Sequence, residues 1–274
     1  MIKTMDIIIF GGQSNMQGQT ETLSECVEVP GAFEYKWITD SIVPLKNPVG
    51  EDIRYDGAAG WRIVEGGSAS DWRAAHGLGS SCYGNTNMVP AFCRAYLQNA
   101  NTPVISVHAA KGSTQIKDWL PGTDGWRLLS QKSKAAIAYV QAHGTLGHVF
   151  FAWLEGESDA IFSVSKNDYK RMLEELATAL QKEVGVEQFG IIRVGEFVKD
   201  ERDMEIIAAQ DEICQEDDRF LMLTDIALTL NKMPEMMNPK VGGHYSALGL
   251  ETLGTAAGKA LREFANAQDI GPSH

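Results

Sequence analysis

A single serine stands in a polar, glycine-rich stretch directly after an apolar run near the N-terminus. Residues 5–10 read MDIIIF and lead into GGQSNMQGQ, which places Ser14 where a predicted strand turns into a helix. A hydroxyl there is suited to nucleophilic attack, because a helix N-terminus and its free N–H groups favour developing negative charge. Gly11 and Gly12 would allow the tight turn. The alternative is that Ser14 only caps the helix.

A histidine near the other end of the chain is the natural base for this serine. His244 lies in VGGHYSALG, a glycine-rich loop before a helix that Ser246 is expected to cap. A serine needs a neighbouring base to become a useful nucleophile, and imidazole titrates near neutral pH. The alternative is a solvated loop histidine. Among the other histidines, His108 falls inside a predicted strand and is expected to be a packing residue.

Two further stretches carry groups that could take part in chemistry. Gly112, in AAKGSTQIKDW, could offer its N–H to an oxyanion or could be a simple turn glycine. The stretch EGESDA places Glu155, Glu157 and Asp159 close together. Such carboxylates could act as acid and base or as metal ligands, although a solvated loop or helix start has the same composition.

The elements that must position these residues alternate along the chain. Short apolar runs predict strands, and amphipathic stretches with 3.6-residue spacing predict helices. Continuous apolar strands separated by helices indicate a parallel sheet covered on both faces, with ligands beyond the carboxyl ends of its strands. The predicted strands are 5–10, 103–109, 148–154, 188–194 and 219–225, and the predicted helices are about 89–99, 127–142, 166–184, 202–216 and 246–266.

One region lacks this alternation. Residues 19–88 are rich in glycine and aromatic residues and show little periodicity. We expect a long irregular insertion there, either a binding loop or a lid that packs its own aromatic side chains.

Composition excludes several classes of partner. The net charge of −12, from 24 basic and 36 acidic residues, argues against duplex nucleic acid or an anionic membrane as a partner. The four cysteines form no CxxC pair, so we expect reduced thiols rather than a zinc site or a disulfide scaffold. No run approaches the length of a membrane span, and the N-terminus resembles a first strand rather than a signal peptide, so a cytoplasmic location is expected. The sequence predicts no particular oligomeric state.

Four stretches together resemble the sequence blocks of a known superfamily. In order, GGQSNMQG, HAAKGSTQIKDW, WLEGESDA and GGHYSALG are similar to the four blocks of the SGNH hydrolases. They look most like the branch of the sialate O-acetylesterases and carbohydrate esterase family 6, which includes acetyl xylan esterases. The resemblance extends over residues 11 to 249.

The resemblance implies a three-layer α/β/α, flavodoxin-like SGNH hydrolase fold with a central, mainly parallel five-stranded sheet, as a single domain over residues 1–274. It also implies a serine-dependent carbohydrate O-acetylesterase that acts on O-acetylated sugars, with O-acetylated sialic acid as the expected substrate and no metal or cofactor. By match to the motifs, Ser14 is the nucleophile, His244 is the general base, and the N–H groups of Ser14 and Gly112 form the oxyanion hole. The residues expected to support the site are Gln13, Asn15 and Glu157.

Two positions depart from the family pattern. Glu155 stands where the family has an oxyanion-donating glutamine, and an ionised carboxylate cannot donate a hydrogen bond. We therefore expect Glu155 to be protonated, turned away from the oxyanion or part of an altered site. Val241 stands where the family has an aspartate three residues before the histidine. We therefore expect a Ser–His dyad whose imidazole is oriented by a backbone carbonyl or by a carboxylate such as Glu157. The alternative is a weakened or inactive homologue that binds sugar.

The sequence offers two sets of side chains for substrate recognition. A sialic acid carboxylate would require cations, for which the nearest candidates are Arg62, Arg73, Lys111 and Lys117. A neutral acetylated xylan would require aromatic platforms, which could be Trp37, Trp61, Trp72 and Trp119.

Overall fold

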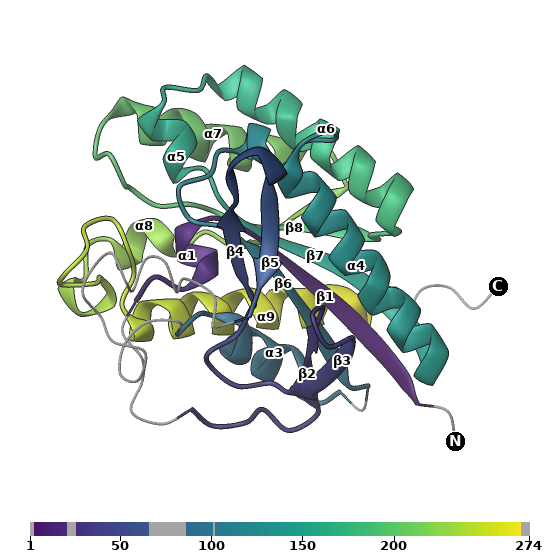
Figure 1. Ribbon diagram of the computed structural model, residues 1–274. Helices are drawn as coiled ribbons and strands as arrows, with labels where there is room; N and C mark the ends of the chain where they lie inside the picture. Colours follow the sequence, from purple (N-terminus) through teal and green to yellow (C-terminus); the bar gives the residue numbers. More distant parts are fainter. Residues whose placement is uncertain (1–2, 21–25, 66–85, 101, 270–274) are drawn as a thin grey trace.

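A seven-stranded sheet forms the centre of the molecule (Figure 1). The computed structural model describes residues 3–20, 26–65, 86–100 and 102–269. The strand order is β3-β2-β6-β1-β7-β8-β9, and every neighbouring pair is parallel except β2 and β3. The strands of this sheet are β1 (Thr4–Gly12), β2 (Ala32–Lys36), β3 (Ser41–Pro44), β6 (Val104–Ala110), β7 (Thr145–Leu154), β8 (Gln188–Ile192) and β9 (Phe220–Thr224).

The five predicted strands are confirmed as β1, β6, β7, β8 and β9. Among themselves they follow the order 2-1-3-4-5, which is the flavodoxin-like arrangement. The direction of chain progression reverses between β1 and β7, so a crevice for a ligand is expected beyond the carboxyl ends of these two strands. The predicted fold class is therefore confirmed.

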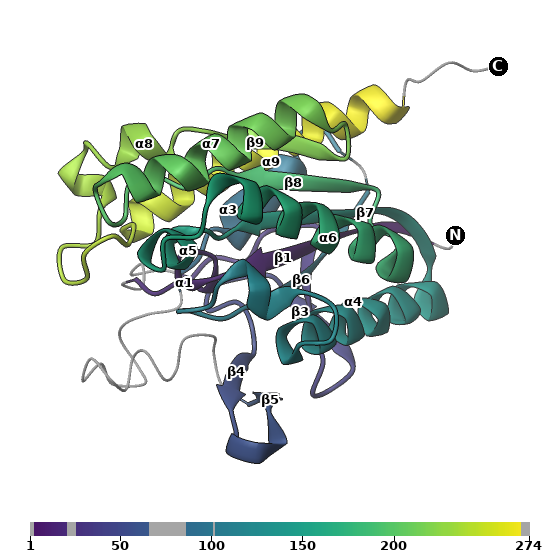
Figure 2. The ribbon, with the colours of Figure 1, turned by 90° about the horizontal axis from the view of Figure 1, so that it is seen from above.

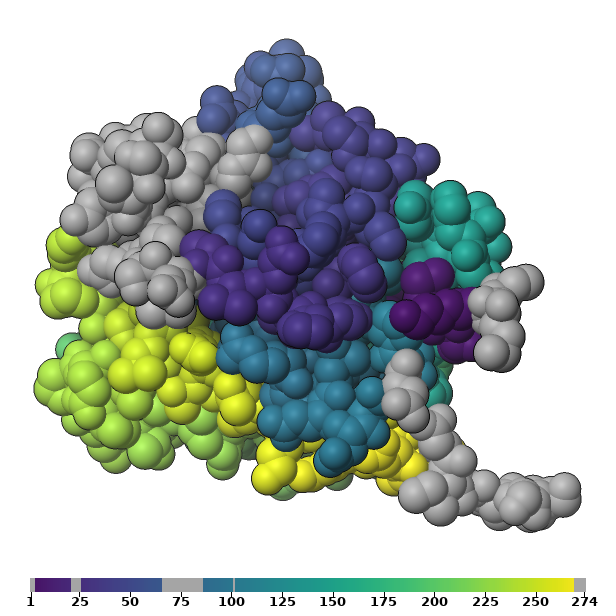
Figure 3. Space-filling model, turned by 90° about the horizontal axis from the view of Figure 1, so that it is seen from below, coloured from purple at the N-terminus to yellow at the C-terminus, as the bar shows by residue number. Residues whose placement is uncertain are grey.

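Two strands extend the sheet beyond the five predicted. Both β2 and β3 come from the region predicted to be irregular, which also contains the hairpin of β4 (Asp52–Tyr55) and β5 (Trp61–Val64). Strand β2 pairs with β6 only over 32–34, so sheet contact rather than a sequence pattern makes it a strand. Figure 3 shows this part of the chain, in purple and blue, lying beside the teal-blue α3 (Val89–Tyr96) and the yellow C-terminal helix.

Helices cover both faces of the sheet, which gives the three-layer architecture (Figure 2). Helices α4, α6 and α7 lie on one face, while α3 and α9 pack against each other on the opposite face. The five predicted helices are confirmed as α3, α4, α6, α7 and α9. The remaining helical bounds are α1 (Ser14–Gln17), α4 (Asp124–His143), α5 (Glu157–Ile161), α6 (Lys166–Val184), α7 (Glu201–Glu216), α8 (Ala227–Leu230) and α9 (Ala247–Asp269), with 3₁₀ turns η1 (Gly57–Ala59), η2 (Ile116–Trp119) and η3 (Pro234–Met236).

The local sequence accounts for where the long helices begin and end. The side chains of Thr123, Ser165 and Asp200 accept backbone N–H groups at the starts of α4, α6 and α7. Helix α6 ends at Gly185, whose φ of 83° is the left-handed conformation that glycine adopts without strain. Ser246 accepts the N–H of Gly249 at the start of α9, as predicted.

The central strand is apolar throughout because both faces of the sheet are covered. Ile7, Ile8 and Ile9 of β1 are completely buried, which explains a continuous rather than alternating pattern. Of the described helices, none combines the length and the apolar character that a membrane crossing needs.

Candidate active site

The turn after β1 sets the position of Ser14. Gly12 has a φ of 143°, and a Cβ at this position would collide with the carbonyl oxygen of Leu154 at the end of β7. That carbonyl accepts the N–H of Gln13 at 3.1 Å, which holds the turn against the neighbouring strand. Gln13 occupies the N-cap position and Ser14 is the first residue of α1, so helix capping does not account for the serine.

A buried carboxylate ties the serine turn to the end of β7. Glu157, which is 3% exposed, accepts the side-chain amide of Gln13 at Oε2 and that of Asn15 at Oε1, both at 2.7 Å. Ser158 donates its hydroxyl to Gln13 Oε1 at 2.8 Å, which fixes the orientation of that amide. The two neighbours of Ser14 are thus held by one carboxylate.

The histidine loop is joined to the same cluster. The N–H of Tyr245, the residue after His244, donates to Asn15 Oδ1 at 3.3 Å. Asn238 donates to the carbonyl of Gln19 at 3.4 Å, and its own N–H bonds to the carbonyl of His244 at 2.8 Å. The loops that carry Ser14 and His244 therefore meet at the same edge of the sheet.

A backbone carbonyl orients the imidazole. Nδ1 of His244 lies 3.0 Å from the carbonyl oxygen of Gly242, and the ring packs edge-on against Phe197 with centroids 5.6 Å apart. If Nδ1 carries the proton donated to this carbonyl, Nε2 carries the lone pair that a general base uses. Glu157 accepts Gln13 and Asn15 instead, so of the two orienting groups considered from the sequence the structure favours the carbonyl.

Gly112 lies beside α1, as the position of its loop beyond β6 predicts. The N–H of Lys111 bonds to the carbonyl of Gly12 at 3.0 Å, and the N–H of Gly112 donates to Gln17 Oε1 at 2.8 Å. A Cβ at Gly112 would collide with the side-chain amide of Gln19, so glycine permits this approach. Sequence reasoning missed Gln17, although its spacing of three residues from Ser14 on a helical turn was a usable signal.

Glu155, at the family glutamine position, is completely buried. Burial raises the pKa of its carboxyl well above the ordinary range, and the nearby Asp159 and Glu157 raise it further. Its Oε2 lies 3.1 Å from the hydroxyl of Tyr169. The pKa of Asp159 is also raised, mainly by burial.

A buried histidine, His108, contacts the backbone of the short helix that carries Ser14. His108 Nε2 lies 3.0 Å from the carbonyl of Met16, and burial lowers the pKa of the imidazole to about 3, so the ring is neutral. The backbone carbonyl of His108 accepts Lys132 Nζ at 2.9 Å, and this buried ammonium pairs with Glu51 at 2.8 Å. His108 is thus a packing residue, as expected.

The residues considered for substrate recognition differ in accessibility. Trp119 is completely buried between Trp61 and Trp153, so the expectation that it forms a sugar platform is wrong. Arg62 pairs with Asp56 at 3.0 Å on the exposed hairpin. Two other candidates, Trp72 and Arg73, lie outside the described residues. The remaining candidates are half-buried or exposed, and they are Trp37, Trp61, Lys111 and Lys117.

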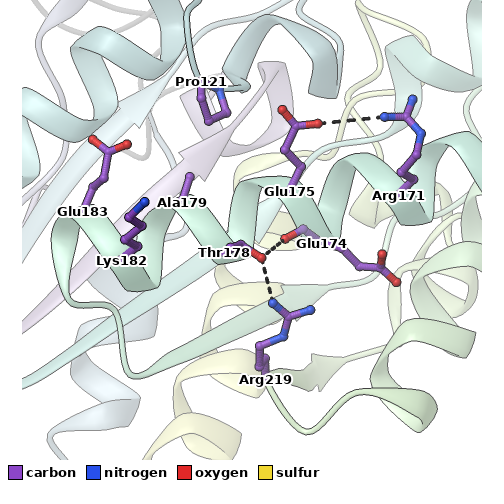
Figure 4. A pocket seen from close by; sticks show the side chains of 9 residues that line it. All are labelled: Pro121, Arg171, Glu174, Glu175, Thr178, Ala179, Lys182, Glu183 and Arg219. Carbon is purple, nitrogen blue, oxygen red and sulfur yellow. Dashed lines mark hydrogen bonds and ion pairs between the residues drawn. The ribbon is translucent and has the colours of Figure 1, made fainter.

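A separate hollow on the surface is lined by charged side chains of α6 (Figure 4). In it Arg171 pairs with Glu175, and Arg219 donates to the hydroxyl of Thr178 at 2.9 Å. These cations are already engaged, and none of the lining residues comes from the loops around Ser14. The hollow is therefore not part of the candidate site.

Comparison with known proteins identifies the family. The sequence profile of the carbohydrate esterases described as sialic acid-specific acetylesterases matches residues 4–256. The chain belongs to this family. The match confirms the resemblance to the sialate O-acetylesterases, and membership in this esterase family supports an esterase activity. No curated protein matches the chain significantly.

Solved structures with low sequence identity share the fold of this chain. A protein from Arabidopsis thaliana is 15% identical with a TM-score of 0.57, covering 93% of this chain and 96% of its own. A lipase/acylhydrolase from Enterococcus faecalis is 13% identical, with a TM-score of 0.51 and coverage of 94% and 96%. A carbohydrate acetylesterase from Xanthomonas citri is 14% identical with a TM-score of 0.52, and the match covers 96% of this chain but 56% of that one.

Proposed function

We propose that the protein is a carbohydrate O-acetylesterase that uses Ser14 as nucleophile and His244 as general base. The observation that carries this proposal is the bridge made by Asn15. Its side chain donates to Glu157 and accepts the N–H of Tyr245, so one residue links the serine turn to both other loops. Such cross-bracing is what a catalytic pair from opposite ends of a chain requires.

The proposed reaction begins with proton transfer from Ser14 to Nε2 of His244. The serine oxygen forms a bond to the acetyl carbonyl carbon, and the carbonyl electrons move to its oxygen. When the tetrahedral intermediate collapses, the sugar oxygen leaves with the proton from His244. Water, deprotonated by the same imidazole, then attacks the acetyl-serine and releases acetate.

The N–H groups of Ser14 and Gly112 are the proposed oxyanion donors. In the structure Gln17 Oε1 accepts the N–H of Gly112, so the substrate carbonyl oxygen must displace this amide to reach it. Glu155 is not assigned as an oxyanion donor, since its Oε2 lies beside the Tyr169 hydroxyl. Loss of one oxyanion donor typically lowers the rate by roughly 10²–10³-fold, which leaves a slower but working esterase.

O-acetylated sialic acid is the proposed substrate. The family description supports it, and Lys111 directly precedes Gly112, where its cation could bind a sugar carboxylate. Acetyl xylan, which is neutral, is the competing substrate. Acetate release from O-acetyl sialate and from acetyl xylan should be measured side by side, with Lys111→Met as the probe. We expect this variant to raise the KM for the sialate alone, whereas an equal change for both substrates would contradict carboxylate recognition.

The test of the catalytic proposal is the hydrolysis of an aryl acetate by Ser14→Ala. We expect loss of nearly all activity, while Ser41→Ala on β3 should retain the wild-type rate as a matched control. Equal rates for wild type and Ser14→Ala would show that this serine is not the nucleophile. An inactive wild type that still binds an O-acetylated sugar would favour the non-catalytic alternative.

A further inference from the structure

Two buried carboxyl groups meet between β7 and the loop that carries Gly112. Glu155 and Asp159 both have no exposed surface. Asp159 Oδ2 accepts the backbone N–H of Ile116 at 3.0 Å, and Ile116 begins the turn η2 directly after the Gly112 loop. Asp159 therefore joins the segment that follows β7 to the segment that carries Gly112.

The other two oxygens of these carboxyls have no conventional donor. Glu155 Oε1 and Asp159 Oδ1 are buried, and no N–H or O–H of the described residues donates to either of them. After burial, Asp159 is the largest cause of the raised pKa of Glu155, so the two carboxyls lie close to each other. Because ionised carboxylates are acceptors only, these two oxygens can satisfy each other only when one carboxyl carries a proton and donates it to the other.

The surroundings of the pair assign the proton to Glu155. Asp159 receives the N–H of Ile116, which favours its ionised form. The Tyr169 hydroxyl donates most closely to the backbone carbonyl of Glu155, at 2.7 Å, and lies 3.1 Å from Oε2. The charged groups that face the pair are Glu157 from α5 and Asp118 and Lys117 from η2, while Tyr169 from α6 and Gln210 from α7 face it with neutral side chains.

We propose that Glu155 is a positioning residue that stays protonated at neutral pH and donates its O–H to Asp159. This shared proton would hold Asp159 in place, and through Asp159 the loop that carries Gly112. A glutamine at this position could donate an N–H in the same direction without titrating. The proton thus allows the Glu155 carboxyl to donate a hydrogen bond where the family has a glutamine amide. Only the activity readout below rests on the proposed esterase function.

The proton has a consequence for stability that can be measured. An acid whose pKa is raised by folding stabilises the native state at low pH, and this stabilisation is lost as pH rises from the unfolded pKa toward the folded one. Glu155→Gln removes the titration but keeps a donor. We therefore expect the Tm of wild type to fall relative to that of Glu155→Gln as pH rises above the ordinary pKa of a glutamate, about 4.3.

The direct test is infrared spectroscopy of the carboxyl groups in the intact protein at neutral pH. We expect a carbonyl stretch from a buried, protonated carboxylic acid in wild type and its loss in Glu155→Gln. Glu175→Gln, on the exposed side of α6, should leave the band unchanged. Identical spectra for wild type and Glu155→Gln, or parallel Tm profiles, would overturn the proposal.

Two further variants keep the outcome clear. If Glu155→Gln does not fold, Asp159→Asn replaces the carboxylate acceptor by an amide oxygen, and the band should shift; an unshifted band would overturn the proposal. On an aryl acetate, Glu155→Ala should lose most of the wild-type rate, because it removes the donor to Asp159. Absence of hydrolysis by the wild type as well would refute the esterase function, while the infrared result would still decide the protonation.

Discussion

Replacing Glu157 by glutamine perturbs the candidate site with little change in shape. The carboxylate accepts two amide hydrogen bonds of 2.7 Å, from Gln13 and Asn15. Neither amide can turn over without loss elsewhere, because Gln13 Oε1 accepts Ser158 and Asn15 Oδ1 accepts the N–H of Tyr245. A glutamine at position 157 would accept only one of the two amides and would direct its own NH₂ group at the other.

The expected cost follows from these contacts. One hydrogen bond to a charged group, worth roughly 1.5–3 kcal/mol, is lost, and a buried N–H is left unpaired at about 1–3 kcal/mol. Because effects of neighbouring groups are not additive, we expect Glu157→Gln to lower the free energy of unfolding by about 3–5 kcal/mol. The loosened serine and histidine loops should also lower kcat for an aryl acetate by roughly 10²-fold.

Urea denaturation and aryl acetate hydrolysis measure the two effects separately. Glu175→Gln, with the same change of charge on the surface of α6, is the matched control and should alter neither. The kinetics should be measured well below the denaturation midpoint, so that only folded protein contributes. Wild-type stability together with wild-type kcat in Glu157→Gln would refute the assignment of this carboxylate as the centre of the cluster.

Three other predictions concern the turns and the buried ion pair. Gly12→Ala should lower the free energy of unfolding by about 3 kcal/mol or more, because the new Cβ would collide with the Leu154 backbone and because the φ of Gly12 is positive. A smaller loss measured by calorimetry would contradict the view that this turn requires glycine. Gln17→Ala should lower KM for an aryl acetate, because it releases the N–H of Gly112 to bind the substrate carbonyl oxygen. The lost hydrogen bond should lower the free energy of unfolding by about 1 kcal/mol. Loss of activity in this variant would count against the N–H of Gly112 as an oxyanion donor. Burial opposes ionisation of Glu51, but Lys132 together with the N–H groups of Ile38 and Trp37 lowers its pKa, so the stabilisation from these contacts is lost as pH falls through that pKa. Lys132→Met should reduce this acid sensitivity and cost about 3–5 kcal/mol in urea denaturation at neutral pH, and a variant as stable as wild type would contradict the buried pair.

Much of the fold could be predicted because its pattern is local. The run of Ile7, Ile8 and Ile9 indicates a strand buried on both faces, and the spacing from Tyr169 to Val184 indicates one amphipathic helix. Strand β2 could not be predicted in this way, since it is short and owes its conformation to pairing with β6.

The contacts within the site form between segments that are distant in the sequence, so they could not be predicted from local patterns. Trp119 looked like an exposed platform in the sequence, but it packs against Trp153 in the core. The family glutamine position drew attention to Glu155 as an anomaly, yet its partner Asp159 was assigned only to a generic acidic cluster. Which carboxyls are buried, and which of them share a proton, depends on neighbouring helices that no local pattern specifies.

Labelling with a fluorophosphonate, followed by peptide mapping, tests the central claim most directly. Such a reagent reacts with a serine only where a base activates its hydroxyl. We expect one adduct, on the peptide that contains Ser14, no adduct in Ser14→Ala, and much slower labelling in His244→Asn. An adduct on another residue, or equal labelling of wild type and Ser14→Ala, would contradict the account.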